Sequence, residues 1–184
     1  HKQIKVANPY ERKALSIKSW QETFAHQLDI NIKKIQYSYA KPRNFKRLRI
    51  NNLVGINYLV PIGWESKRPS DKWIDSLNKA LLSLKYDVSN QPKPTSLRDY
   101  IEWINSCNIL ITVEGLGLHI GLALRKKVIL LSGPVTRTEH LVDNLRCFSV
   151  KESQKCKLCK KGEVFSPNCQ CMDTISLDEV INNI

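Results

Sequence analysis

Several features that mark common classes of protein are missing from this chain of 184 residues. No apolar run approaches the roughly 20 residues that a membrane-spanning helix needs. We find no HExxH zinc pattern, no Ser-His-Asp arrangement and no P-loop, since neither Gly-Lys-Ser nor Gly-Lys-Thr occurs. The chain begins with His1 instead of Met, and its first residues lack the apolar core and cleavage site of a signal peptide, so we expect a fragment.

Glycine is scarce and unevenly distributed. Of seven glycines, three fall within the seven residues of Gly115 to Gly121, beside Glu114 and His119. Apolar runs at 108–113 and 126–134 predict buried strands on either side, with a short buried helix between them. In such a parallel unit the glycine turn lies at the carboxyl edge of the sheet, where ligands bind, and a helix start there suits a diphosphate. The alternative is a tight turn with Glu114 in a surface ion pair and His119 packed on the helix.

The charge balance is strongly positive, with 29 Lys and Arg against 17 Asp and Glu. This excess favours an anionic partner such as a nucleotide, a phosphorylated sugar, an acidic lipid or nucleic acid, although a solvated lysine-rich surface explains it equally well. The segment 41–49 ("KPRNFKRLR") is the densest basic cluster. It is expected to be a solvated linker, with peripheral contact to an acidic membrane as the alternative.

Hydrophobic periodicity divides the chain at about residue 52. The first part shows an amphipathic helix at 16–28 and a half-buried strand at 33–40. The second part predicts strands at 57–62, 86–88 and 146–150 and helices at 70–85, 95–106 and 176–184, with caps at Ser70, Ser96 and Ser176. We therefore predict a Rossmann-like, three-layer α/β domain with a parallel sheet over 52–184 and a Cys-rich loop near its end. Residues 1–51 are expected to be the tail of an amino-terminal domain and a linker.

A second loop at the same edge of the sheet is suited to phosphate. In "PIGWESKRPSDKW", Gly63, Ser66, Lys67 and Arg68 lie between a strand and a helix. A lysine there could neutralise charge on a leaving phosphate, whereas by itself a solvated Lys-Arg pair is the simpler interpretation.

The order of these motifs resembles a known family. Three segments are similar, in the same order along the chain, to the carboxyl-terminal half of family-nine glycosyltransferases, the ADP-heptose:lipopolysaccharide heptosyltransferases and their relatives. The segments are "GWESKRPSDKWIDSLNKAL", "TSLRDYIEWINSCNILITVEGLGLHIGLALRKKVILLSGP" and "CKLC…CQCM…ISLDEVI". The resemblance covers most of residues 55–184. It implies a GT-B enzyme whose second Rossmann-like domain binds a nucleotide-diphosphate-sugar donor.

The resemblance also implies roles for particular residues. Lys67, Glu114 and His119 would be the catalytic residues, with Glu114 at the donor sugar and His119 near the phosphates. The donor-binding residues would be Gly63, Ser66, Lys67, Arg68, Gly115, Leu116, Gly117 and Leu118. Transfer would be inverting and would need no metal, because the lysine and the helix end take the role of a divalent cation. The acceptor would be a lipopolysaccharide or another cell-surface glycan, which implies a cytoplasmic protein or one at the inner face of the cytoplasmic membrane.

The chain departs from the family pattern at three places. Glu114 stands where the family has aspartate, and the turn glycine is shifted. The segment between Leu84 and Thr95 is shorter than the family's, and the acceptor-binding amino-terminal domain is missing. We therefore expect an enzyme domain that is incomplete as this chain alone.

Four of the six cysteines form one group, Cys156, Cys159, Cys169 and Cys171. Their CxxC and CxC spacing predicts a structural Zn²⁺ site, with two disulfides or four free thiols as alternatives.

Two other functions stay open at this point. One is a non-catalytic, basic, zinc-bearing α/β module that binds nucleic acid; scattered cations and the lack of aromatic-studded basic strands argue against it. The other is a degenerate glycosyltransferase domain that kept the fold and lost the donor site.

Overall fold

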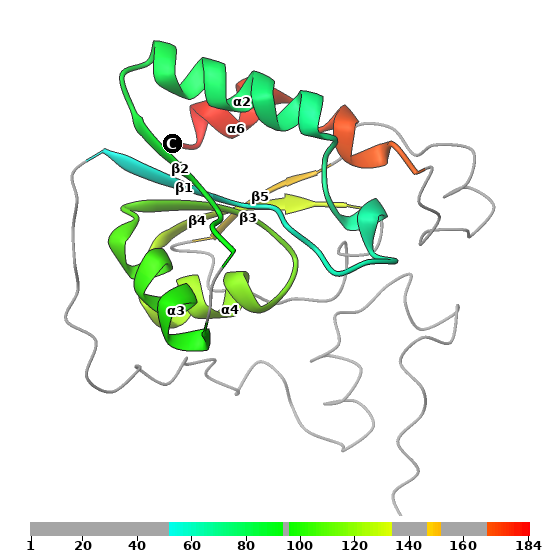
Figure 1. Ribbon diagram of the computed structural model, residues 1–184. Coiled ribbons are helices and arrows are strands. Elements are labelled where there is room, and N and C mark those ends of the chain that lie inside the picture. Colours follow the sequence, from blue (N-terminus) through cyan, green and yellow to red (C-terminus); the bar gives the residue numbers. More distant parts are fainter. Residues whose placement is uncertain (1–51, 94–95, 134–146, 152–168) are drawn as a thin grey trace, which may run out of the picture.

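A computed structural model describes residues 52–93, 96–133, 147–151 and 169–184 (Figure 1). The strands are β1 (Leu53–Asn57), β2 (Asp87–Asn90), β3 (Ile109–Val113), β4 (Lys127–Ser132) and β5 (Cys147–Lys151). The α-helices are α2 (Asp71–Ser83), α3 (Leu97–Ser106), α4 (Leu116–Ala123) and α6 (Leu177–Asn182), and the 3-10 turns are η2 (Glu65–Lys67) and η3 (Cys171–Thr174). The helix expected at 16–28, the strand at 33–40 and the basic segment 41–49 lie outside the described residues.

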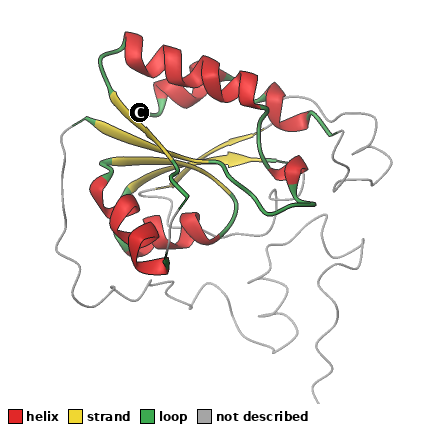
Figure 2. Cartoon of the chain, in the orientation of Figure 1, coloured by secondary structure: helices red, strands yellow, loops and turns green. Residues whose placement is uncertain are grey.

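The strands form a single five-stranded sheet in the order β2-β1-β3-β4-β5, and all four pairings are parallel. Helices α2 and α6 cover one face, and α3 and α4 cover the other, which gives three layers (Figure 2). The predicted three-layer α/β fold with a parallel sheet is therefore confirmed. The chain leaves β1 toward β2 on one side and returns to β3 on the other, so the space between the carboxyl ends of β1 and β3 is the topological switch point.

The core follows from the alternation of side chains along the strands. Val54, Ile56 and Ile111 point to the layer that holds α2 and α6, and Leu110 points to the layer that holds α3 and α4. Helix α2 contributes Trp73, Ile74, Leu77 and Leu81 to the first cluster. Since β1, β3 and β4 are buried on both faces, they read as nearly continuous apolar runs in the sequence.

Local signals set the starts of the helices as predicted. The Ser70 hydroxyl accepts a hydrogen bond from the backbone N–H of Trp73 at the start of α2. The Ser96 hydroxyl does the same for Asp99 in α3, and Ser176 for Glu179 in α6. Each cap satisfies one of the backbone donors that a helix start leaves without an intrahelical partner.

The strand predicted at 57–62 is wrong in its bounds. Strand β1 ends at Asn57, and the residues beyond it form a loop in which Tyr58 and Val60 are partly buried against the core and Ile62 is 97% exposed. Pairing explains the difference, because the last residue of β1 in register with β3 is Asn57, opposite Thr112. Within the described ranges, no helix has the length and apolar character needed to cross a membrane.

Candidate functional site at the switch point

A pocket of about 390 Å³ opens at the carboxyl edge of the sheet. Its wall is made by the segments that follow β1, β2 and β3 and by α3 and the start of α4. The lining residues are Asn57, Leu59, Val60, Pro61, Trp64, Lys67, Gln91, Tyr100, Val113, Glu114, Gly115, Leu116 and Gly117. We call it the switch-point pocket, because it lies between the carboxyl ends of β1 and β3, where ligands bind in open α/β sheets.

Lys67, at the end of η2, is the cation of this pocket. Its Nζ lies 2.9 Å from Oε2 of Glu114, which follows β3, and 4.3 Å from the centre of the Trp64 ring. The two charged side chains are only 15% and 12% exposed. A pair this enclosed is screened less by solvent than a surface pair, so its charges act strongly on any ligand in the pocket.

The glycine turn between β3 and α4 is built on a backbone conformation that only glycine adopts readily. Gly115, the N-cap residue of α4, has φ 150° and ψ −163°, and no atom of the described residues lies within 4 Å of a Cβ placed there. The turn therefore needs glycine for its backbone angles and leaves open space beside them. The free backbone N–H groups of the helix start and its positive dipole end are suited to an anion at this position.

The floor of the pocket is polar although the side chains that form it are buried. Tyr100 on α3 donates a hydrogen bond of 2.6 Å to Oδ1 of Asn57, and Nδ2 of Asn57 donates one of 2.7 Å to Oγ1 of Thr112. Burial raises the pKa of Tyr100 to about 12, despite the opposing hydrogen bond to Asn57. The phenol therefore keeps its proton at neutral pH and remains a donor.

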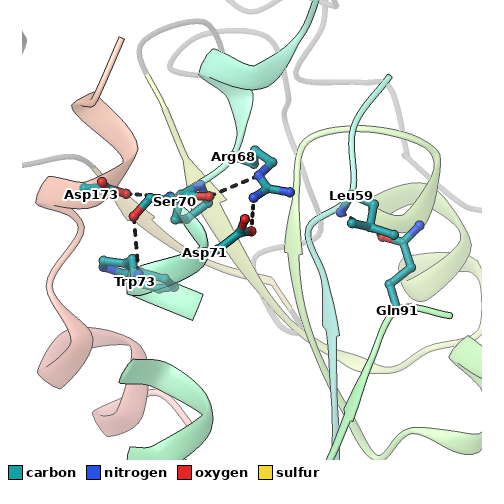
Figure 3. Close-up of polar contacts among 8 residues, drawn as sticks. Leu59, Arg68, Ser70, Asp71, Trp73, Gln91 and Asp173 are labelled. Atoms are coloured by element: carbon teal, nitrogen blue, oxygen red, sulfur yellow. Dashed lines mark hydrogen bonds and ion pairs between the residues drawn. The ribbon is translucent and has the colours of Figure 1, made fainter. Parts of the chain in front are cut away.

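Arg68 belongs to a different pocket. Its guanidinium pairs with the carboxylate of Asp71 and donates a hydrogen bond of 3.2 Å from Nε to the Pro69 carbonyl (Figure 3). It also lies over the Tyr58 ring. This second pocket, of about 560 Å³, also includes Cys169, Gln170 and Asp173 beside η3. We call it the η3 pocket. Oδ1 of Asp173 accepts a hydrogen bond of 2.7 Å from the backbone N–H of Ser70, which ties η3 to the start of α2.

Comparison with solved structures adds to this geometry. E. coli ADP-heptose lipopolysaccharide heptosyltransferase II superposes with a TM-score of 0.54 and 14% sequence identity, over 89% of this chain and 49% of that one. The two proteins share a fold. A family-nine glycosyl transferase from Veillonella parvula DSM 2008 superposes with a TM-score of 0.49 and 17% identity, over 71% of this chain and 44% of that one. No protein-family model and no curated protein sequence matches the chain.

The chain thus spans about half the length of these two solved structures. The predicted resemblance to the heptosyltransferases is confirmed at the level of the fold. Whether the described domain ends at the bounds predicted for it, 52–184, stays a prediction.

The heptosyltransferase-like fold brings together part of the predicted site. The residues that line the switch-point pocket are Lys67, Glu114, Gly115, Leu116 and Gly117. Gly63 has φ 87° in the preceding turn, where its N–H bonds to the Glu65 carboxylate, and Leu118 is buried in the core. Neither of them, nor Arg68, His119 or Ser66, lines this pocket. Their roles in ligand binding stay predictions.

Ser66 differs from Lys67, its neighbour, in where its side chain lies. Its hydroxyl is buried and has no hydrogen-bond partner within the described part of the chain. His119 lies half-buried on α4. The expected ion pair of Glu114 exists, but it is enclosed in the pocket and not on the surface.

The pocket residues that the sequence analysis did not identify include two amides and two aromatic side chains: Asn57, Gln91, Trp64 and Tyr100. Asn57 carried the clearest signal, as the polar last residue of an otherwise apolar strand. Gln91 directly follows β2, where its Oε1 accepts a hydrogen bond of 3.0 Å from the Leu59 N–H (Figure 3). Tyr100 looked like any inward-facing residue of an amphipathic helix, and periodicity does not separate a core tyrosine from one at a pocket.

The predicted zinc ligands are only partly described. Cys169 and Cys171 are buried thiols at η3, whereas Cys156 and Cys159 lie outside the described residues. In the described ranges, no group of three or more His, Cys, Asp or Glu side chains is arranged to hold a metal ion. The zinc site stays a prediction.

Proposed function

We propose that this chain is the donor-binding half of an inverting glycosyltransferase related to the heptosyltransferases. The donor would be a nucleotide-diphosphate sugar, bound in the switch-point pocket. The observation that carries the proposal is the position of Lys67, whose ammonium lies in one pocket with the glycine turn at the start of α4. A lysine and a helix N-terminus facing one cavity provide the charge and the backbone donors that a diphosphate needs.

The proposal gives each side of the pocket a role. Lys67 would bind a diphosphate oxygen and neutralise the charge that develops when the bond to the sugar breaks. The backbone of Gly115 to Gly117 would hold the same diphosphate from the other side. Glu114, already hydrogen-bonded to Lys67, would orient the lysine and contact the donor sugar, so that a bound phosphate and Glu114 share the ammonium group.

The transferring site would be completed by a second domain that binds the glycan acceptor. Apolar side chains at this edge support the idea, because Leu59, Trp64 and Leu116 line the pocket and are exposed. Single exposed apolar residues are ordinary, but three at the rim of one pocket suit an interface that closes over the donor. The acceptor would be a lipopolysaccharide or a similar cell-surface glycan.

The test is the thermal stability of the protein against a panel of nucleoside diphosphates and nucleotide sugars. A ligand that binds only the folded protein, present at 100 times its Kd, stabilises it by about 2.7 kcal/mol, which gives a clear rise in Tm. We expect a rise with one nucleotide, and loss of that rise in Lys67→Met. The matched control is Lys72→Met, which removes the same charge from an exposed position on α2 that lines neither pocket.

Each outcome separates the alternatives. Equal responses of Lys67→Met and Lys72→Met would place the ligand elsewhere. A flat panel, with the melting transition intact, would favour a degenerate domain that kept the fold without the donor site. Oligonucleotide binding that weakens steeply with salt would instead favour the nucleic-acid module.

A further inference from the structure

A buried chain of hydrogen bonds runs under the glycine turn. It begins at the Tyr100 hydroxyl, passes through the Asn57 side-chain amide to Oγ1 of Thr112, and ends where Thr112 donates a bond of 2.8 Å to the Val113 carbonyl. The exposed fractions of Tyr100, Asn57 and Thr112 are 9%, 4% and 0%. Every step has a donor and an acceptor, so the chain fixes the orientation of the Asn57 amide.

The location of this chain is unusual for its layer of the core. On the same face of the sheet, two residues earlier in each strand, Leu110 of β3 belongs to the apolar cluster with residues of α3 and α4, and Gly55 of β1 lies against Cys107 and Leu110. Two residues further along each strand, the next positions on this face carry the polar side chains of Asn57 and Thr112. Burying polar groups has a cost that apolar residues of the same size avoid, and a fully hydrogen-bonded network offsets that cost and makes the local structure rigid.

Gly117 shows what the chain of hydrogen bonds supports. A Cβ on Gly117 would lie 2.3 Å from Nδ2 of Asn57 and 2.5 Å from the Tyr100 hydroxyl, so the first turn of α4 rests directly on these two side chains. The chain also ends on the carbonyl of Val113. It therefore holds the backbone on both sides of the segment from Glu114 to Leu116.

We propose that Asn57 and Tyr100 are positioning residues that hold the Glu114–Leu116 turn at its distance from Lys67. They act through the Val113 carbonyl and the Gly117 backbone. Glu114 reaches Lys67 across 47 positions of sequence, and the start of α4 faces the same pocket, so both depend on where this turn lies. The consequence for ligand binding rests on the proposed function, whereas the order of the turn does not.

The first experiment measures amide hydrogen exchange in two variants. Tyr100→Phe removes one hydroxyl. A triple variant replaces all three side chains of the hydrogen-bond chain with apolar groups of similar size, which keeps the core filled: Asn57→Leu, Thr112→Val, Tyr100→Phe. The control is Ile104→Val, which removes a buried methyl group from the same helix. We expect exchange at Glu114 to Gly117 to rise about tenfold or more in both variants, with Leu110 and Ile111 still protected. Unchanged exchange at the turn in the triple variant would overturn the proposal.

The second experiment measures the Kd for ADP and for UDP in the same proteins. We expect the Kd of the nucleotide that binds the wild type to rise about tenfold in Tyr100→Phe. In Ile104→Val the Kd should stay within about twofold of the wild-type value. Binding by Tyr100→Phe that equals the wild type would show that the turn does not need this support, and would overturn the proposal. If the wild type binds neither nucleotide, the proposed function is at fault, and the exchange experiment alone decides the positioning role.

Discussion

Lys67 and Arg68 are adjacent in the sequence and face different pockets. Lys67 reaches across the switch point to Glu114 in a pair that is nearly enclosed, with exposed fractions of 15% and 12%. Arg68 turns to the other side of the loop and pairs with Asp71, whose side chain is 80% exposed, beside η3. One pair joins two loops at the carboxyl edge of the sheet, and the other is local to the start of α2.

Of these two neighbouring cations, Lys67 is the better placed to bind an anionic ligand. The Lys67 pair lies in a pocket with glycine backbone and a helix start, so a bound anion would find several donors at once. The Arg68 pair lies in a pocket that also holds the carboxyl groups of Glu65, Asp71 and Asp173. Three carboxylates near one guanidinium make the η3 pocket a poor site for a diphosphate.

The largest expected contrast is between the two acidic partners. Glu114→Gln leaves the Lys67 ammonium in the pocket without its counter-charge, and should lower the free energy of unfolding by about 1–3 kcal/mol. Asp71→Asn breaks an exposed pair and should cost less than about 1 kcal/mol. Urea unfolding of both variants measures the difference. Equal costs would mean that the enclosed pair contributes no more than the exposed one.

Alkaline pH should weaken the side of the domain that holds Tyr100. The pKa of this group is raised in the folded protein, so its contribution is fully present below the unfolded value of about 10 and is lost as pH rises toward 12. Across that window the unfolded chain releases the proton first, and this one group lowers the free energy of unfolding by roughly 1.4 kcal/mol per pH unit. Urea unfolding between pH 9 and about 12 measures the free energy of unfolding at each pH. Its decrease with pH should be less steep for Tyr100→Phe than for the wild type, and equal decreases would contradict the prediction.

The start of α2, on the side of the η3 pocket, should respond to loss of its cap. Ser70→Ala removes the hydroxyl that accepts from the Trp73 N–H, at a cost of about 1 kcal/mol. The control is Ser76→Ala in the same helix, where the hydroxyl bonds only to the Lys72 carbonyl and alanine is the better helix former. Thermal unfolding compares the two. A cost for Ser76→Ala as large as that for Ser70→Ala would exclude capping as the cause.

The smallest expected effect is that of zinc on the switch-point pocket. We predict about one Zn²⁺ per chain by elemental analysis, lost when Cys156 and Cys159 are both changed to Ser. Because Cys169 lines the η3 pocket and not the switch-point pocket, chelation should lower the Tm but change the nucleotide Kd by less than about twofold. A larger change in Kd would mean that the two pockets are coupled.

The order and type of the elements could be predicted from local signals in the sequence. Three Ser caps, the helical spacing of Trp73, Leu77 and Leu81, and the apolar run of β3 each act over a few residues, so they are legible without the fold. The bound of β1 could not be predicted, because it depends on where the register with β3 ends. Leu97, the apolar first residue of α3, is 59% exposed, which the apolar spacing of the helix does not reveal.

A parallel α/β domain with two polar loops at one edge could be predicted from the sequence, because strand, helix and turn preferences are local. The tertiary structure decided which side chains of those loops meet. Lys67 bonds to Glu114, which is 47 positions away in the sequence, and Tyr100 bonds to Asn57, which is 43 positions away. No pattern of hydrophobic periodicity reveals either contact. The physical reason is that a side chain in an irregular loop takes its direction from backbone angles and neighbours that only the packed sheet and helices supply.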